Sequence, residues 1–249
     1  MKYLLLVGMV AVGTMAGAQT KIEKTIPVKA GQQLVLNLDY PEARIQTWDK
    51  AEVLITGTVS INQGENDDAF QLDISSTPAG VMVTSQLKDK DNIPPRIMIK
   101  RGEKEYFFKA SNFHDPEVQK FLAENGNEYA YRSTGIHQDI HLTIFVPRNT
   151  PVEVNAKYGM VEVASFEGPL SANSKYGGVD VTFPLQFNGQ INATSQYGEI
   201  YTNLEASFDR SMNDGKNGKR WTAITTRLGN GPAFAIESKY GNIYLRKSK

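Results

Sequence analysis

The clearest pattern in this chain is an alternation of apolar and polar residues around four Tyr-Gly pairs. The positions six, four and two residues before each tyrosine are apolar or small, and the positions between them are mostly polar. Because side chains alternate between the two faces of a strand, each segment predicts a strand with one buried face. The pairs are Tyr158-Gly159, Tyr176-Gly177, Tyr197-Gly198 and Tyr240-Gly241.

The alternation changes phase at each pair. Apolar residues now occupy the third and fifth positions after the tyrosine, as Val161 and Val163 do in the first unit. A continuous strand cannot change phase without turning its apolar face to water. A bend or bulge at the glycine permits the change, since glycine tolerates the positive φ angles that corners often need. Each unit is therefore predicted to be a strand, a glycine corner and a second strand.

The same template fits a segment near the start of the chain. Tyr40 follows an alternating leucine strand, Pro41 takes the glycine position, and Ala43 and Ile45 take the inner positions beyond the corner. Proline costs no hydrogen bond at a corner whose N–H group is unpaired. The N-terminal and C-terminal regions are therefore expected to share one architecture.

The spacing of the units predicts how they are arranged. From 158 to 176 to 197 to 240 the intervals are 18, 21 and 43 residues, and the last is close to two units. A repeat of about 20 residues is typical of stacked β-units. A degenerate unit with Leu228 in the tyrosine position and Gly229 after it would fill the long interval, which also holds a polar loop or hairpin tip. The predicted fold class is all-β, with β-solenoid-like stacked strand repeats and a small hairpin and helix insert.

Three regions follow a leader of residues 1–18. Residues 19–91 form an N-terminal β-repeat region, residues 92–138 an insert with one short helix, and residues 139–249 the C-terminal Tyr-Gly region. We expect 19–249 to be one continuous domain. Within the insert, Gly102 marks a hairpin turn. Asp115 is a good N-cap before Pro116, and Gly126 is expected to stop the helix.

The first eighteen residues are typical of a secretory signal peptide. Lys2 supplies a positive charge, an apolar run of 13 residues extends from Leu4 to Ala16, and Ala16-Gly17-Ala18 resembles a cleavage site. The alternative is an uncleaved N-terminal anchor, but the run is short for a membrane span. No later segment is apolar enough to predict a transmembrane helix. The sequence therefore predicts an exported protein of the periplasm, the cell surface or the surrounding medium.

The net charge and the absence of cysteine restrict the expected partners and the expected cellular location. The chain has 27 basic and 27 acidic residues, and without Lys2 the difference is 26 − 27 = −1. No strong field exists to attract nucleic acid or anionic membranes, so no nucleic-acid partner is expected. The absence of cysteine excludes disulfides and a lipid-modified cysteine. Because secreted eukaryotic domains often use disulfides, a bacterial envelope or secreted protein fits better.

Several stretches resemble the bacterial β-strand-repeat domains known as putative adhesins, a family of unknown function. The resemblance lies in Ala43–Val59, which contains Trp48-Asp49-Lys50 and Glu52-Val53, and in His141–Val163, which contains Val146-Pro147. It covers most of the chain apart from the leader and the insert. It implies a β-solenoid or stacked β-repeat fold and an envelope or surface role, and brings no catalytic residues. Family members usually carry Gly-Asp or Ser-Gly at the corner, so Tyr-Gly is a departure.

Signals for enzymatic or metal chemistry are sparse. The strongest candidate metal site is His137, Asp139 and His141, which alternate onto one strand face, although such a trio is also typical of the solvated side of a half-buried strand. The stretch "NDGKNG" lacks the alternating acids and terminal glutamate of a calcium loop. No nucleophile elbow, P-loop or dinucleotide motif is present. No cofactor is predicted.

The tyrosines allow two interpretations. Parity along the strand assigns them to the inner face, where aromatic contacts would stabilise the stack. Alternatively, a column of tyrosines could bind sugars. If parity holds, a better binding surface is the outward ladder beside the pairs, formed by Lys157, Lys175, Gln196 and Lys239.

The function predicted from these features is non-enzymatic binding, with an adhesin-like or envelope-scaffold role toward an envelope protein or a glycan. Two alternatives remain open at this point: a carbohydrate-active enzyme on a β-helical scaffold, and an envelope sensor domain.

Overall fold

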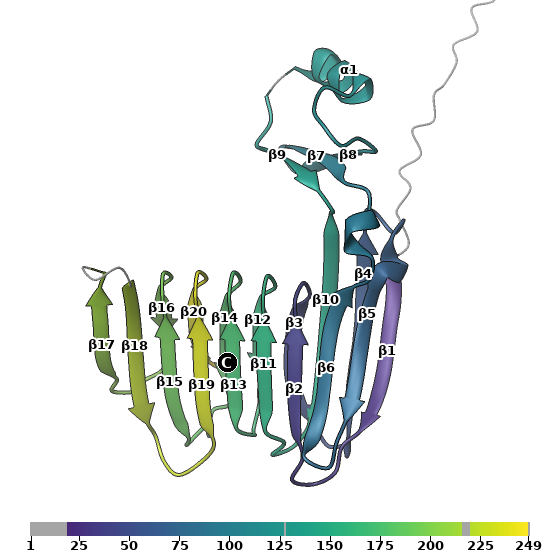
Figure 1. Ribbon diagram of the computed structural model, residues 1–249. Helices are drawn as coiled ribbons and strands as arrows, with labels where there is room; N and C mark the ends of the chain where they lie inside the picture. The colour runs from purple at the N-terminus through teal and green to yellow at the C-terminus, as the bar shows by residue number, and fades with distance from the viewer. Residues whose placement is uncertain (1–18, 127, 216–219, 249) are drawn as a thin grey trace, which may run out of the picture.

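A computed structural model describes residues 19–126, 128–215 and 220–248, and most of them belong to two large β-sheets that face each other (Figure 1). The predicted leader, residues 1–18, lies outside the described residues. The eight-stranded sheet runs in the order β1 (Thr20–Pro27), β4 (Glu52–Ile61), β10 (Gln138–Pro147), β3 (Glu42–Trp48), β12 (Val161–Ala164), β14 (Val179–Phe183), β20 (Ile243–Lys247), β16 (Ile200–Thr202).

The second sheet has nine strands, and the two sheets enclose one continuous apolar core. Its order is β17 (Asp209–Asp214), β18 (Arg220–Arg227), β15 (Gln190–Ser195), β19 (Ala233–Ser238), β13 (Leu170–Ser174), β11 (Val152–Ala156), β2 (Gln33–Leu38), β6 (Gly80–Leu87), β5 (Phe70–Ser76). Two short 3₁₀ turns, Asp67–Ala69 and Lys90–Asn92, lie in the connections. The predicted all-β class is confirmed.

Each tyrosine unit contributes one strand to each sheet, and neighbouring units pair in parallel and in register. Val152 pairs with Leu34 on one side and Leu170 on the other, and Val161 pairs with Ala43 and Val179 in the opposite sheet. The side chains at these positions are buried, as the alternation predicted on both sides of the corner. The template also holds for the unit around Tyr40, which forms β2 and β3.

The spatial order of the units differs from their order in the sequence. The last unit, β19 and β20, lies between β13–β14 and β15–β16 in both sheets. The tyrosines therefore follow one another in space as 40, 158, 176, 240 and 197. The strands β17 and β18 form an antiparallel hairpin that extends only the nine-stranded sheet beyond β15, as Figure 1 shows.

The degenerate unit expected at Leu228 and Gly229 is not formed. β18 runs antiparallel to β15 and ends at Arg227, so these two residues fall in the loop that leads to β19. A repeat unit needs parallel neighbours, and β18 has none. The long interval between Tyr197 and Tyr240 instead contains the β17–β18 hairpin, in agreement with the loop or hairpin tip predicted from its polar residues. Residues 216–219, at its tip, lie outside the described residues.

The corner glycines are required for a different reason from the one expected. None of the four has a positive φ angle. Instead, a Cβ atom at Gly177 would lie 2.1 Å from the carbonyl oxygen of Gly159, and one at Gly241 would lie 1.7 Å from that of Gly177. Each corner packs its backbone directly against the next. Pro41 lies at the start of this series, where its carbonyl oxygen occupies the space beside Gly159.

The insert forms a small third sheet, β8 (Lys104–Phe108), β7 (Arg96–Arg101) and β9 (Tyr131–Gly135), with the helix α1 (Pro116–Asn125) beside it. It has a separate core that includes Ile97, Ile99 and Val118, and Figure 1 shows it projecting beyond the end of β10. The Asp115 carboxylate accepts a 2.9 Å hydrogen bond from the Glu117 N–H group, which confirms the predicted N-cap.

The single α-helix among the described residues is too short and too polar to cross a membrane.

Candidate functional site

The five tyrosines form a stacked column along one edge of the molecule. From Tyr40 through Tyr158, Tyr176 and Tyr240 to Tyr197, successive ring centroids lie 5.6, 5.3, 5.3 and 5.2 Å apart, with interplanar angles of 16° or less. The predicted column is present, but its predicted orientation is wrong. The Tyr158, Tyr176, Tyr197 and Tyr240 side chains are 44–47% exposed, and hence are not inward plugs.

The orientation differs because the strand ends before the tyrosine. β11 ends at Ala156, two residues before Tyr158, and the intervening backbone already bends. Strand parity therefore does not extend to the tyrosine. The last buried side chains before the four Tyr-Gly bends are small, such as Ser174, Ser195 and Ser238.

The predicted ladder lies directly beside this column. The ammonium groups of Lys157, Lys175 and Lys239 lie 5.2, 4.9 and 5.3 Å from the ring centroids of the tyrosines that follow them. Cation–π attraction of this kind holds each ammonium near its ring at the corner end of the strands. Lys157 also reaches the Asp39 carboxylate at 3.9 Å. The fourth member, Gln196, occupies the same position in the last unit of the stack.

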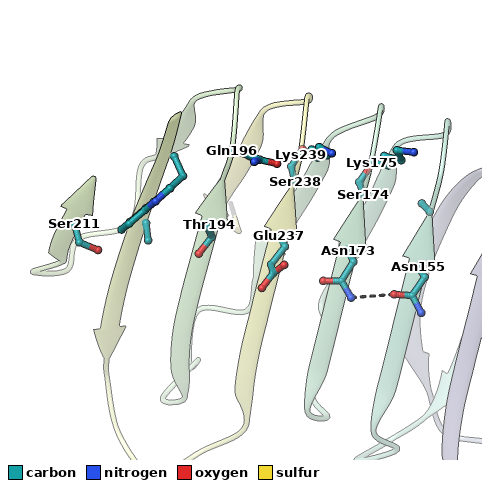
Figure 2. Close-up of a pocket in the computed structure, with 13 residues that line it drawn as sticks. Asn155, Asn173, Ser174, Lys175, Thr194, Gln196, Ser211, Glu237, Ser238 and Lys239 are labelled. Carbon is teal, nitrogen blue, oxygen red and sulfur yellow. Dashed lines mark hydrogen bonds between the residues drawn. The ribbon is translucent and has the colours of Figure 1, made fainter. Parts of the chain in front are cut away.

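A second feature adjoins the ladder: a groove of about 750 Å³ on the outer face of the nine-stranded sheet. Figure 2 shows its labelled side chains on neighbouring strands, with Lys175, Lys239 and Gln196 toward the corner end of the strands. The lining residues are Asn155, Ala156, Asn173, Ser174, Lys175, Thr194, Gln196, Ser211, Trp221, Ala223, Glu237, Ser238 and Lys239. The groove therefore includes three of the four predicted ladder residues and omits Lys157.

The floor of the groove is a row of polar side chains set by strand register. Asn155, Asn173, Glu237 and Thr194 are successive partners across β11, β13, β19 and β15. The Asn173 amide donates a 2.9 Å hydrogen bond to the Asn155 carbonyl oxygen, and Asn155 donates in turn to Asn37 at 3.1 Å. Glu237 is exposed, and its carboxylate accepts no hydrogen bond from any described residue.

One end of the groove is formed by the β17–β18 hairpin. Trp221 lies one position beyond the Ser195–Thr222 pair, which places it beside Gln196 at the end of the ladder row. Its ring is partly exposed, and its indole N–H group donates to no described residue. Ser211 and Ala223 continue the floor row across the hairpin.

The rim of the groove is positively charged. Lys175 and Lys239 are exposed at the corners that directly follow the adjacent strands β13 and β19. Among the described residues, no carboxylate lies within 4.0 Å of either ammonium. Among the described residues that line the groove, Glu237 contributes one carboxylate. The groove can therefore offer two cations, amide donors and acceptors, hydroxyl groups and one aromatic face.

The predicted metal trio is only partly assembled. The His141 imidazole contacts Asp139 at 2.7 Å and Glu42 at 3.2 Å on the exposed face of β10. His137 precedes the strand and packs edge-on against Phe107 in the insert. Its burial lowers its pKa below the ordinary value. No group of three metal ligands is found in the described part of the chain.

The two short motifs behind the family resemblance, Trp48-Asp49-Lys50 and Val146-Pro147, lie beside contacts that join neighbouring strands. The Trp48 indole N–H donates a 2.7 Å hydrogen bond to the Glu52 carbonyl oxygen, and the ring packs on Phe145. Arg148, which follows Val146-Pro147, bridges Asp49 and Glu167. The Arg148 guanidinium lowers the pKa of the Asp49 carboxyl. These contacts fasten the ends of β3, β10 and β12.

Comparisons with known proteins add little to this geometry. No family model matches the chain, and no curated protein matches it. Among solved structures, it is similar to a "putative cell adhesion protein" from Clostridium sporogenes, at 10% identity and a TM-score of 0.48, over 92% of this chain and 100% of that one. It is also similar to a "putative adhesin" from Bacteroides fragilis, at 9% identity and a TM-score of 0.22, over 93% and 99%. Neither similarity is strong enough to carry an argument.

Proposed function

We propose that this protein is an exported, non-enzymatic β-repeat binding protein with an adhesin-like or envelope-scaffold role. Its ligand surface is the groove on the outer face of the nine-stranded sheet. The observation that carries the proposal is the combination of an aromatic end at Trp221, a regular polar floor and two lysines that have no carboxylate partner among the described residues. Ligand sites commonly combine a concave surface with a few convergent polar groups.

The scaffold supports this role because it repeats. We interpret the parallel, in-register units as a β-solenoid-like stack, in which each unit adds one side chain to every row of the outer face. Stacked repeats of this kind create extended surfaces suited to elongated ligands. The predicted signal peptide supports export to a compartment where such ligands occur.

The groove chemistry favours binding over hydrolysis. Most glycoside hydrolases use two carboxylates that flank the scissile bond. Glu237 is the one carboxylate among the described residues that line the groove. A glycan is favoured over an envelope protein because the floor offers amides, hydroxyls and an aromatic ring that can pair with sugar hydroxyls and stack on a sugar ring.

A glycan array combined with a turnover assay tests the proposal. We expect saturable binding to a subset of glycans and no shortened products after prolonged incubation with the bound polysaccharides. Release of new reducing ends would overturn the non-enzymatic assignment. Absence of binding to every glycan, together with capture of one envelope protein from extracts, would replace the glycan by that protein.

A further inference from the structure

We infer that the groove takes an anionic polysaccharide whose carboxylates lie at the lysine rim. This inference deepens the proposed binding function and rests on it. It commits to one occupant, a chain of uronic-acid sugars laid across the strands.

The charge at the rim is the first reason. Lys175 and Lys239 directly follow the adjacent strands β13 and β19. Main-chain hydrogen bonds hold them in register: the Lys239 N–H group donates to the Ser174 carbonyl oxygen and the Tyr240 N–H group donates to the Lys175 carbonyl oxygen, at 2.9 and 3.0 Å. Neighbouring strands lie about 4.8 Å apart, a spacing comparable with one sugar residue in an extended chain. Each ammonium is held near its tyrosine ring and has no carboxylate partner among the described residues. Two adjacent cations of this kind complement successive carboxylates.

The floor supplies the second reason. Both N–H groups of the Asn155 amide are used, toward Asn37 and Glu153. Asn173, which also lines the groove, uses one N–H group and accepts no hydrogen bond from a described residue, so its carbonyl oxygen and second N–H group are free to bind a ligand there. Glu237 beside it offers acceptors only. This mixture of one amide donor and several acceptors is suited to the hydroxyl groups of a sugar.

The end wall distinguishes a sugar from an acidic peptide. Trp221 presents a partly exposed ring and an indole N–H group that donates to no described residue, and the two together can stack on and hydrogen-bond a pyranose. An extended peptide binds most readily at a sheet edge, where it gains main-chain hydrogen bonds. The groove lies on the face of paired central strands, whose main-chain groups already bond within the sheet.

The test compares two polymers with the same backbone. Polygalacturonate carries a carboxylate on each sugar, and its fully methyl-esterified form carries none. We expect wild-type protein to bind the acid roughly tenfold more tightly, since two exposed charge pairs each add modestly to the affinity. The double variant Lys175→Gln/Lys239→Gln should lose that preference and bind the two polymers with similar affinity, because both positive charges at the rim are removed. Lys157→Gln is the matched control, because Lys157 has the same ring contact but lies outside the groove and pairs with Asp39.

The results distinguish a failure of this inference from a failure of the proposed function. Equal affinity of the wild type for both polymers overturns the inference while leaving the binding function in place. Binding of poly-glutamate through the same lysines, with neither sugar polymer bound, overturns the choice of a sugar. Absence of any glycan ligand on the array removes the glycan-binding function on which this inference rests. Trp221→Phe, which keeps a flat ring, should retain most affinity, whereas Trp221→Ala should lose about tenfold or more.

Discussion

At the scale of single residues, each Tyr-Gly pair lets neighbouring corners pack closely and adds one ring to the exposed tyrosine column. The glycine lets the backbone of one corner contact the carbonyl oxygen of the next, and the tyrosine turns outward to stack on its neighbours. The strand has ended before either residue, so both belong to the corner. The pair is therefore a device for stacking the units and not a ligand motif in itself.

Replacing a corner glycine should destabilise the stack strongly. In Gly177→Ala, the new Cβ would lie 2.1 Å from the Gly159 carbonyl oxygen, and the expected loss in free energy of unfolding is roughly 3 kcal/mol. The control is Gly31→Ala, which has open space and a φ of +84°, and should cost about 1 kcal/mol. Urea denaturation measures both. An equal loss for the two variants would contradict the close-contact explanation.

The tyrosine column should stabilise through ring stacking and not through the hydroxyl groups. Tyr176 stacks on two rings, so Tyr176→Ala should lose about 1–3 kcal/mol, at about 0.5–1.5 kcal/mol for each pair. Tyr197 stacks on one ring of the column, and Tyr197→Ala should lose about half as much. Tyr176→Phe should be nearly neutral. Thermal unfolding of the three variants checks this order, and a large loss in the phenylalanine variant would argue against it.

Sequence reasoning predicted the strands and the phase change at this scale, but not the direction of the tyrosines. The alternation of Val152, Val154 and Ala156 identifies a buried face because these residues are within a strand. Parity could not be extended to Tyr158, because nothing in the alternation marks where the strand ends. The Asn155–Asn173–Glu237 row could have been found by aligning the units, since all three residues lie three positions before a tyrosine.

At the scale of elements, two additions modify the repeat. The β17–β18 hairpin supplies Trp221 and turns a flat sheet face into a groove. The insert is joined to the body at Asn62, which is buried and whose amide donates to Pro94 while its carbonyl oxygen accepts from the His137 N–H group. Trp221 was missed by sequence reasoning because the pairing of β18 with β15 leaves no periodic signal.

The free energy of unfolding should depend on pH through His137, which lies where the insert joins the two large sheets. Burial lowers the pKa of His137, so below about pH 6.5 the unfolded chain binds a proton more readily than the folded chain. The free energy of unfolding should therefore fall as the pH drops from 7.5 to 5.5, and above pH 7.5 the ring is neutral in both states. His137→Phe should reduce this fall, whereas replacement of the exposed His114 by Gln should not. Melting temperatures at both pH values provide the measurement. An unchanged fall in His137→Phe would contradict the assignment.

At the scale of the whole molecule, the last unit of the chain holds the stack together from within. β19 and β20 lie between neighbours on both sides in both sheets, although they come last in the sequence. The alternation predicted that stacked two-strand units exist. It could not predict their spatial order, because every unit offers its neighbours the same main-chain N–H and C=O groups along its strand edges.

Removing the last unit should therefore destabilise the neighbouring unit of β15 and β16 as well. A chain ending at Pro232 would lose β19 and β20, and the unit of β15 and β16 would lose its parallel neighbours. We expect loss of cooperative unfolding and rapid proteolysis of residues 190–232. Circular dichroism with limited proteolysis checks this. A truncated chain that still unfolds cooperatively and protects β15 would contradict the order of units.

The most direct test of the account is calorimetric binding of the best array glycan to the wild type, Trp221→Ala and Tyr201→Ala. Tyr201 is the matched control, because it is 50% exposed but lies on the other sheet, stacked on Tyr244. We predict saturable binding, weakened about tenfold or more by Trp221→Ala and unchanged by Tyr201→Ala, with the glycan recovered at its original length. Equal affinity of all three proteins, or a shortened glycan, would contradict the proposal.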